Sequence, residues 1–310
     1  MSSPRVRLVI AFAIVYVVWG STYLAIHYAI QTIPPLLALA ARFLAAGGIL
    51  YVWYRLRDGV RPTALQWRNT AIIGTLLLLG GTGAVALAEQ TVPSGTAALL
   101  VAVVPLWTVL IDWLRPGGKR PTASVLLGVA AGLVGMVVLV GPDSIYGHGP
   151  VDVRGAIVLM LGSFSWAAGT VFARHCEMPR SQVAASAMEM VAGGVACLVA
   201  GIAAGEWGAF HPGAVSRESL AGLLYLIVFG SIIAYSAYTW IVQHAASAAV
   251  GTYAYVNPIV AVFLGWLIAG EPVTPRTLLG AAIIVAAVGI ITVMANRPRL
   301  PRAPELQRTT

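Results

Sequence analysis

Two long stretches of this sequence repeat one another, and this internal repeat limits the folds open to the chain. Residues 90–113, QTVPSGTAALLVAVVPLWTVLIDW, align at a constant offset of 153 with residues 243–266, QHAASAAVGTYAYVNPIVAVFLGW. Each stretch is an apolar run with a short polar entry and a proline near its middle, Pro105 in the first and Pro258 in the second. Apolar runs of this length that tolerate glycine and proline are typical of helices that cross a bilayer. The repeat therefore predicts a membrane protein whose two halves share one plan.

The rest of the chain continues the same pattern. Charged residues make up 10% of the sequence and hydrophobic residues 59%, whereas a soluble domain carries about 25% charged residues. The first run lacks an A-x-A-like cleavage site and leads directly into the next, so we interpret it as an uncleaved helix. Ten runs, each close to the roughly 20 residues needed to span the hydrocarbon, lie at about 8–28, 35–54, 69–88, 94–114, 122–141, 154–173, 182–204, 219–242, 247–269 and 276–295.

The basic residues predict the orientation of these helices. With the N-terminus inside, 15 of the 19 Lys and Arg residues fall in inner segments, and only Arg154, Arg217 and Arg276 fall in outer ones. Such a bias predicts that both termini lie in the cytoplasm, and we expect the protein to be in the inner membrane. Basic loops beside apolar runs also account for the net charge of +8, so nucleic-acid binding is not expected. We expect residues 296–310 to form a disordered cytoplasmic tail.

Five helices in each half would invert the second half relative to the first. The predicted units are residues 8–141 and 154–295, an all-α arrangement of two inverted five-helix repeats. At an offset of 147, Trp19 aligns with Trp166 and Tyr23 with Thr170. Inverted repeats are common in secondary transporters, which bind substrate near the midplane between the repeats.

The chain resembles a known family at several of these segments. WGSTYLAIHYAI, AARFLAAG, AEQTVPSGTAALLVAVVPLW and TYAYVNPIVAVFLGWLIAGE are similar to the EamA-type, ten-helix branch of the drug/metabolite transporter superfamily, and the likeness covers nearly the whole chain. It implies a bundle in which helices one to four and six to nine surround a central cavity, with helices five and ten at the periphery. It further implies export of amino acids, other small metabolites or drugs.

The first candidate site residues are polar and aromatic side chains within predicted spans. Polar groups in a span must face protein or a water-filled path, and aromatic faces can hold an ammonium group. Packing between helices and an interfacial aromatic belt are the alternative interpretations. The repeated prolines deprive backbone carbonyls of their usual donors, so those carbonyls are possible acceptors for a ligand. The prolines could equally serve only to kink the helix. The predicted substrate-binding residues are Trp19, Tyr23, Gln90, Pro105, Trp166, Thr170, Tyr235, Tyr238, Asn257 and Pro258.

Two charged residues lie within predicted spans. Arg42 falls about seven residues into the second helix from outside, and Glu189 about seven into the seventh from inside. Intramembrane charges are functional candidates by default, although Arg42 could equally snorkel or hold a kinked backbone. Glu89 and Asp112 lie nearer span ends, where we expect water or headgroups to solvate them. No carboxylate occupies the first helix, which weakens the case for proton antiport.

Enzymatic chemistry has little support in this sequence. No His or Cys pair has metal-ligand spacing, and no nucleophile has a base beside it, so no catalytic residue, metal or cofactor is expected. Cys176 falls in a loop and Cys197 in a span, so no disulfide is expected. We therefore predict a carrier for small metabolites, most readily amino acids or related amphiphiles, working in the bilayer as a monomer or homodimer. The alternatives are a broad exporter of drugs or lipophilic cations and, from another class, a passive pore.

Overall fold

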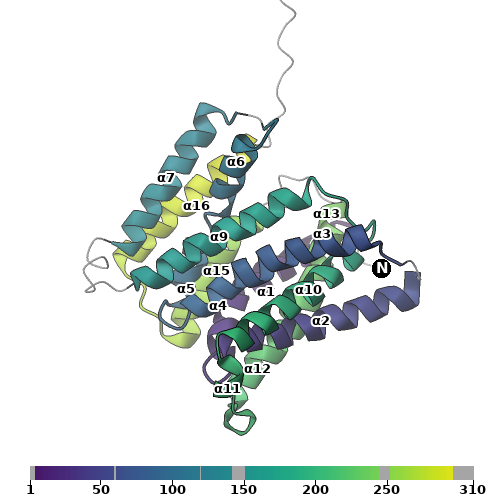
Figure 1. Ribbon diagram of the computed structural model, residues 1–310. Helices are drawn as coiled ribbons and strands as arrows, with labels where there is room; N and C mark the ends of the chain where they lie inside the picture. Colours follow the sequence, from purple (N-terminus) through teal and green to yellow (C-terminus); the bar gives the residue numbers. More distant parts are fainter. Residues whose placement is uncertain (1–3, 59–60, 119, 142–150, 245–251, 296–310) are drawn as a thin grey trace, which may run out of the picture.

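The structure is a computed structural model of the whole chain, and it describes residues 4–58, 61–118, 120–141, 151–244 and 252–295. These residues form a bundle of helices with no strand among them, which confirms the predicted all-α membrane fold (Figure 1). The elements are α1 (Pro4–Ala29), α2 (Pro35–Asp58), α3 (Ala64–Gly74), η1 (Thr75–Gly83), α4 (Ala84–Ala88), α5 (Ser94–Val101), α6 (Val104–Leu114), α7 (Ala123–Val140), α9 (Val153–Ala173), α10 (Gln182–Ala203), α11 (Glu206–Ala209), η2 (Pro212–Ala214), α12 (Arg217–Tyr225), η3 (Leu226–Ile233), α13 (Ala234–His244), α15 (Tyr253–Ala269) and α16 (Pro275–Ala295).

The lengths of these helices suit a bilayer. Within the described ranges, eight helical stretches are long and apolar enough to span it, and two shorter apolar stretches, Tyr253–Ala269 and Pro275–Ile291, follow them. Large apolar side chains remain exposed on the outside of the bundle, among them Leu127 and Val137, each at 71%. Such exposure would favour aggregation in water but is what lipid contact requires. The predicted tail, residues 296–310, lies outside the described residues.

The helices of the two halves pack against each other in matching pairs. α1 contacts α12, η3, α13 and α15, whereas α9 contacts α3, η1, α4, α5 and α6. α2 lies against α10, where close approach is made possible by small residues: a Cβ atom on Gly47 would come within 2.8 Å of Met190, and one on Gly194 within 2.9 Å of Leu44. α2 and α10 therefore cross closely at glycines of both helices.

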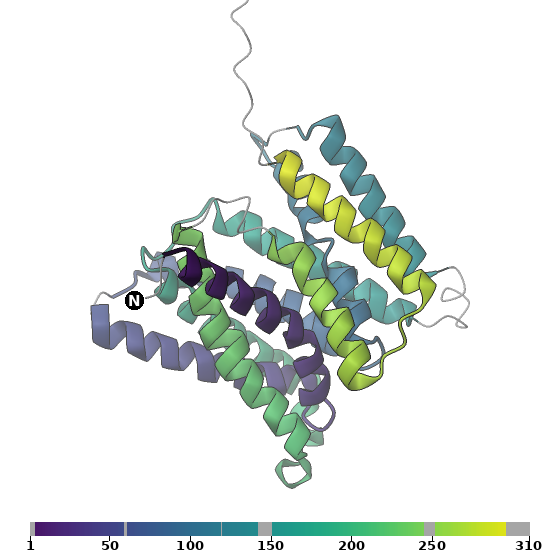
Figure 2. The same ribbon diagram turned by 180° about the vertical axis from the view of Figure 1, so that it is seen from behind.

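α7 and α16 pack on each other beside this central group, as both views of the ribbon show (Figures 1 and 2). The glycine stripe of α7 serves this contact, because Cβ atoms on Gly128 and Gly135 would meet Ile291 and Ile284 of α16. The glycine stripe therefore packs against a helix of the same chain.

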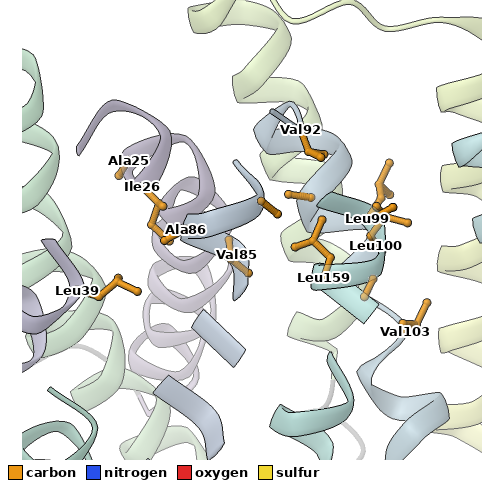
Figure 3. Packing of buried hydrophobic residues seen from close by; sticks show 14 of the residues in the cluster. Ala25, Ile26, Leu39, Val85, Ala86, Val92, Leu99, Leu100, Val103 and Leu159 are labelled. Carbon is orange, nitrogen blue, oxygen red and sulfur yellow. The ribbon is translucent and has the colours of Figure 1, made fainter. Parts of the chain in front are cut away.

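The core is built from small and branched apolar side chains at the crossing points. Ala25 and Ile26 of α1, Val85 and Ala86 of α4, and Leu99 and Leu100 of α5 are buried there (Figure 3). Small side chains at crossings let helices approach closely, which is how association is driven in lipid.

Two spans contain π-helical turns, which the sequence analysis did not predict. η1 interrupts the third span and η3 the eighth, and each continues at both ends into α-helix. A π-helical stretch inside an α-helix is rare and is frequently found at functional sites. Pro105 has the expected effect, since the fourth span breaks at Ala102–Val103 between α5 and α6. Pro258 lies inside α15 without interrupting it.

Two glutamates cap helices that belong to the other half of the sequence. Glu206 follows Gly205 at the end of α10, and its carboxylate accepts hydrogen bonds from the backbone N–H groups of Leu36 (3.2 Å) and Leu37 (3.0 Å). Glu271 follows Gly270 at the end of α15 and accepts from Ser94 (2.7 Å) and Gly95 (2.9 Å). A negative charge at a helix N-terminus satisfies orphan donors and interacts favourably with the dipole.

Each glycine before a capping glutamate has a backbone conformation that disfavours other residues. Gly205 has φ +80° and Gly270 has φ +66°, values in the left-handed region where glycine ends helices without steric cost. The Ala-Gly-Glu sequence occurs at both places. It is the sequence signal by which these caps could have been found.

Candidate functional site

Four aromatic side chains from α1, α13 and α15 meet in the interior of the bundle. The ring of Trp19 lies 5.0 Å from that of Tyr238 and 5.3 Å from that of Tyr253, measured between centroids. Tyr238 in turn lies 5.8 Å from Tyr253 and 6.2 Å from Tyr235. We call Trp19, Tyr235, Tyr238 and Tyr253 the aromatic cluster. Three of these residues were predicted for the site, and Tyr253, one helical turn before Asn257, was missed.

Hydrogen bonds connect the aromatic cluster to its surroundings. The indole Nε1 of Trp19 donates to the carbonyl oxygen of Gly230 in η3 at 3.2 Å. The hydroxyl of Tyr235 is paired with that of Ser186 on α10. Five elements from both halves, α1, α10, η3, α13 and α15, therefore hold the cluster in place.

Glu189 lies beside the cluster on α10. Its side chain is half-buried, and among the described residues no hydrogen bond or ion pair reaches its carboxylate. The carboxylate is close enough to interact electrostatically with Tyr235 and Tyr238. Arg174, exposed at the end of α9, interacts electrostatically with Tyr238 and Tyr253. A carboxylate without a protein partner next to aromatic faces is suited to bind an ammonium group.

Arg42 lies on the other side of the Trp19–Gly230 contact. It is buried, with 7% of its surface exposed, and its Nε donates to the hydroxyl of Ser231 at 2.9 Å. Its Nη2 lies near Gly230, 3.2 Å from where a Cβ atom there would be. The guanidinium also lies over the ring of Phe43, 4.9 Å from the centroid. Across the described part of the chain, Arg42 and Glu189 form no ion pair with each other.

The repeat-related residues on α9 lie in a similar environment. The ring of Trp166 packs on Gly81 of η1, where a Cβ atom would come within 2.7 Å of the indole. Thr170 donates to the carbonyl oxygen of Trp166 at 2.8 Å, within its own helix. Trp166 thus lies against a glycine of the π-helical segment of the other half, as Trp19 does.

Asn257 makes hydrogen bonds to the backbone that were not expected. It is buried, and with its amide oriented toward its acceptors, Nδ2 donates to the carbonyl oxygens of Tyr16 and Tyr253 at 3.3 Å each. The neighbouring Gly20 of α1 allows this contact, because a Cβ atom there would come within 2.6 Å of Val260. Asn257 therefore links α1 to α15, one helical turn after Tyr253 of the aromatic cluster.

Of the remaining predicted residues, Gln90 and Pro258 lie apart from these contacts, whereas Tyr23 interacts with the aromatic cluster. Gln90 is exposed on the turn after α4 and donates to the carbonyl oxygen of Leu87 at 3.1 Å. Tyr23 interacts electrostatically with Tyr253 and also with Glu89. Pro258 lines an apolar groove of about 550 Å³ between α5, α15 and α16. A groove lined only by apolar side chains on the outside of a membrane bundle suits lipid chains rather than a polar substrate.

No group of three or more metal-ligating side chains occurs among the described residues. The two cysteines are free: Cys176 lies on a loop and Cys197 within α10. Partial burial raises the pKa of the Cys176 thiol, which keeps it protonated and unreactive.

Comparison with known proteins assigns this fold to a family. The sequence profile of the EamA-like transporter family matches residues 7–141 and again residues 153–293. The chain belongs to the EamA-like transporter family. YedA of Escherichia coli K12, named as an uncharacterized inner membrane transporter, is 39% identical over 281 residues, which cover 89% of this chain and 88% of YedA. The PecM protein of Dickeya dadantii is 25% identical over 94% of each chain.

A solved crystal structure supports the fold alone. It is 22% identical, superposes with a TM-score of 0.61, and the match covers 94% of this chain and 99% of that one. Family, relatives and apolar helices together identify this EamA-like protein as a multi-pass membrane transporter of the inner-membrane type.

Proposed function

We propose that this EamA-like transporter exports small zwitterionic amphiphiles, with amino acids as the first candidates, from the cytoplasm. The observation that carries the proposal is the arrangement of Glu189, one turn from the Ser186 that is paired with Tyr235, then the aromatic cluster, then Gly230 and Arg42. A carboxylate stands at one end of this arrangement and a guanidinium at the other. An amino acid carries the complementary pair, an ammonium for Glu189 and the aromatic faces and a carboxylate for Arg42.

The transport mechanism in this proposal is alternating access by two inverted repeats, residues 8–141 and 154–295. Three features support it: the family profile matches each half, α1 and α9 contact corresponding helices of the opposite half, and two glutamates of the second half cap helices of the first. In such transporters one repeat rocks against the other around a site near the midplane. Trp19, Tyr23, Trp166, Thr170, Tyr235 and Tyr238 are proposed to line that site.

The proposed orientation places both termini in the cytoplasm. It is supported by the 15 inner and 3 outer basic residues of the sequence. Reporter fusions after Thr310 and in the segment between α7 and α9 test it, since they should report opposite sides of the membrane. Two reporters on the same side would overturn the inverted arrangement of the halves.

The alternatives differ in what should bind. An exporter of lipophilic cations would use Glu189 and the aromatic cluster, but Arg42 would then repel its substrate. A passive pore would need no aromatic pocket between the repeats. Because the glycines of α7 are used against α16, we propose a monomer as the working unit rather than a homodimer formed through that stripe.

Efflux from proteoliposomes tests the proposal. The protein is reconstituted, the liposomes are loaded with radiolabelled amino acids or with tetraphenylphosphonium, and efflux is measured with and without unlabelled compound outside. We expect saturable amino-acid efflux that is accelerated by counterflow. Efflux of tetraphenylphosphonium alone would favour the drug exporter, and flux that rises linearly with the gradient would favour the pore.

A further inference from the structure

Glu89 is a buried carboxyl group that the proposed substrate site does not use. It ends α4, only 3% of its surface is exposed, and both of its carboxylate oxygens are enclosed with no hydrogen-bond partner in the described part of the chain. The sequence analysis expected water or headgroups to solvate this side chain near the end of its span. That expectation was wrong, because α1, α2, η1 and α9 pack around α4 and enclose its last turn.

The groups around Glu89 disfavour a negative charge there. Glu271 interacts electrostatically with it, and the Glu271 carboxylate accepts hydrogen bonds from the N–H groups of Ser94 and Gly95. Tyr23 of α1 also interacts with Glu89. A buried carboxylate beside a like charge, with no donor to stabilise it, is costly, and the group takes up a proton instead.

The other titratable groups on the surrounding elements do not offset this charge. His27, one turn beyond Tyr23 on α1, has a buried Nδ1 with no partner among the described residues. Asp152 and Arg154 lie at the first turn of α9, where Arg154 is exposed and Asp152 is bound to Thr91. α5, η1 and the outer turns of α2 and α15 carry no titratable side chain facing this end. No arginine, lysine or charged donor of the described residues pairs with Glu89.

We propose that Glu89 is a proton-binding site that couples transport by this protein to proton movement across the membrane. In the conformation described here the carboxyl group is neutral. When α1, α2 and α9, which pack around it, move apart on one side of the membrane, water enters, the O–H bond breaks and the proton passes to water. When the opposite end of the bundle opens instead, as alternating access requires, water on the other side of the membrane returns one proton to the carboxylate, so each cycle moves one proton across. The exchange requires only water as acceptor and donor, and this inference rests on the proposed transport function.

Infrared spectroscopy tests the protonation itself without any substrate. The purified protein in lipid at neutral pH should show the C=O absorption of a protonated carboxylic acid, and Glu89→Gln should remove part of that signal. Glu89→Asp should retain a shifted signal, which guards against a misfolded glutamine variant. Glu218→Gln, at an exposed carboxylate of α12, serves as the control and should leave the signal unchanged. An unchanged signal in Glu89→Gln would overturn the proposal.

A second experiment tests the coupling. Proteoliposomes with equal radiolabelled leucine on both sides are given a pH gradient, and leucine accumulation is measured together with leucine counterflow in the absence of a gradient. We expect accumulation in the wild type, loss of accumulation in Glu89→Gln, and counterflow retained in both. Counterflow without accumulation in the wild type would refute the proton coupling alone. Absence of both, for leucine and for the other amino acids, would instead count against the proposed transport function.

Discussion

The indole nitrogen of Trp19 is hydrogen-bonded to the carbonyl oxygen of Gly230, at 3.2 Å, across the interface between the two halves of the chain. Gly230 lies in the π-helical segment η3, where the regular hydrogen-bond pattern of the α-helix is altered. Trp19 therefore supplies a donor to an irregular part of the backbone and at the same time contributes its ring to the aromatic cluster. These two roles can be separated by mutation.

Two substitutions of Trp19 should lower the transport rate to different degrees. Trp19→Phe keeps an aromatic ring but loses the donor, and the loss of one hydrogen bond of about 1 kcal/mol predicts a decrease of about fivefold in transport rate. Trp19→Ala also removes the contacts with Tyr238 and Tyr253, and aromatic truncation should lower the rate at least about tenfold further. Efflux from proteoliposomes, normalised to the amount of protein, measures both.

The matched control is Trp207→Ala, which removes an exposed tryptophan of α11, 64% of whose surface is accessible. This variant should transport as the wild type does. If Trp19→Ala were equally active, the aromatic cluster would not be the substrate site. Trp166→Ala should resemble Trp19→Ala, because its ring packs on Gly81 in the corresponding place.

The sequence predicts the fold well because bilayer-spanning helices follow from apolar length. The predicted run 94–114 corresponds to α5 and α6, and the run 182–204 to α10. Hydropathy carries no signal for the π-helical turns, since an i→i+5 pattern depends on how neighbouring helices pack. It also misplaced Glu89, because position near a span end does not reveal whether other helices enclose that end.

The site was predicted only in part, for a related reason. The helical periodicity put Tyr235 and Tyr238 on one face, and the structure brings both to Trp19 or to each other. Gln90 occupies an equivalent position in the repeat, yet it is exposed and bonded to its own turn. Repeat symmetry identifies matching positions, but the contacts of each position depend on the actual side chains around it.

Removing either capping glutamate should destabilise the bundle by a similar amount. Glu206→Ala and Glu271→Ala each leave two backbone N–H groups without their acceptor, and loss of an N-cap costs about 1–2 kcal/mol. Because the two caps lie at different helices, the double variant should show the sum of both effects. Thermal unfolding of the detergent-purified protein measures the change in midpoint temperature.

Gly270→Ala provides an independent test of the same structure. At φ +66° an alanine costs about 1 kcal/mol, so this variant should also unfold at a lower temperature. Gly208→Ala is the control, since Gly208 has open space around its Cβ position and no positive φ. Equal stability of Gly270→Ala and Gly208→Ala would show that the α15 terminus does not need a left-handed residue.

Asp152 should make the stability of the folded protein depend on pH in the acid range. Its carboxylate accepts from the Thr91 hydroxyl at 2.8 Å and from the N–H groups of Arg154 and Gly155, and these hydrogen bonds, that of Thr91 first, lower the pKa of Asp152. A carboxyl group with a lowered folded-state pKa adds stability above its ordinary pKa of about 3.9 and loses it as the pH falls through the lowered value. The wild type should therefore exceed Asp152→Asn in unfolding temperature at neutral pH, and the difference should vanish in strong acid.

The hydroxyl of Thr91 supplies the check on this interpretation. Thr91→Val removes the first of these hydrogen bonds while keeping a branched side chain, so the difference between neutral and acid pH should become smaller. A pH dependence that is the same in Thr91→Val and the wild type would assign the effect to other carboxyl groups.

Arg42 and Glu189 should act on transport independently of each other. Arg42 is held by Ser231 on η3, whereas Glu189 lies on α10 beside Tyr235 and Tyr238, and the described residues contain no ion pair between the two. Each charge is therefore expected to bind its own part of the substrate. The free-energy changes of Arg42→Ala and Glu189→Ala, calculated from transport rates at subsaturating substrate, should add in the double variant within about 0.5 kcal/mol.

Arg42→Lys and Glu189→Gln distinguish the roles further: lysine keeps a charge without the planar guanidinium, and glutamine keeps the size of the side chain without the charge. A double variant no slower than the slower single variant would show that the two residues act as one unit, and the separate binding of ammonium and carboxylate would then be wrong.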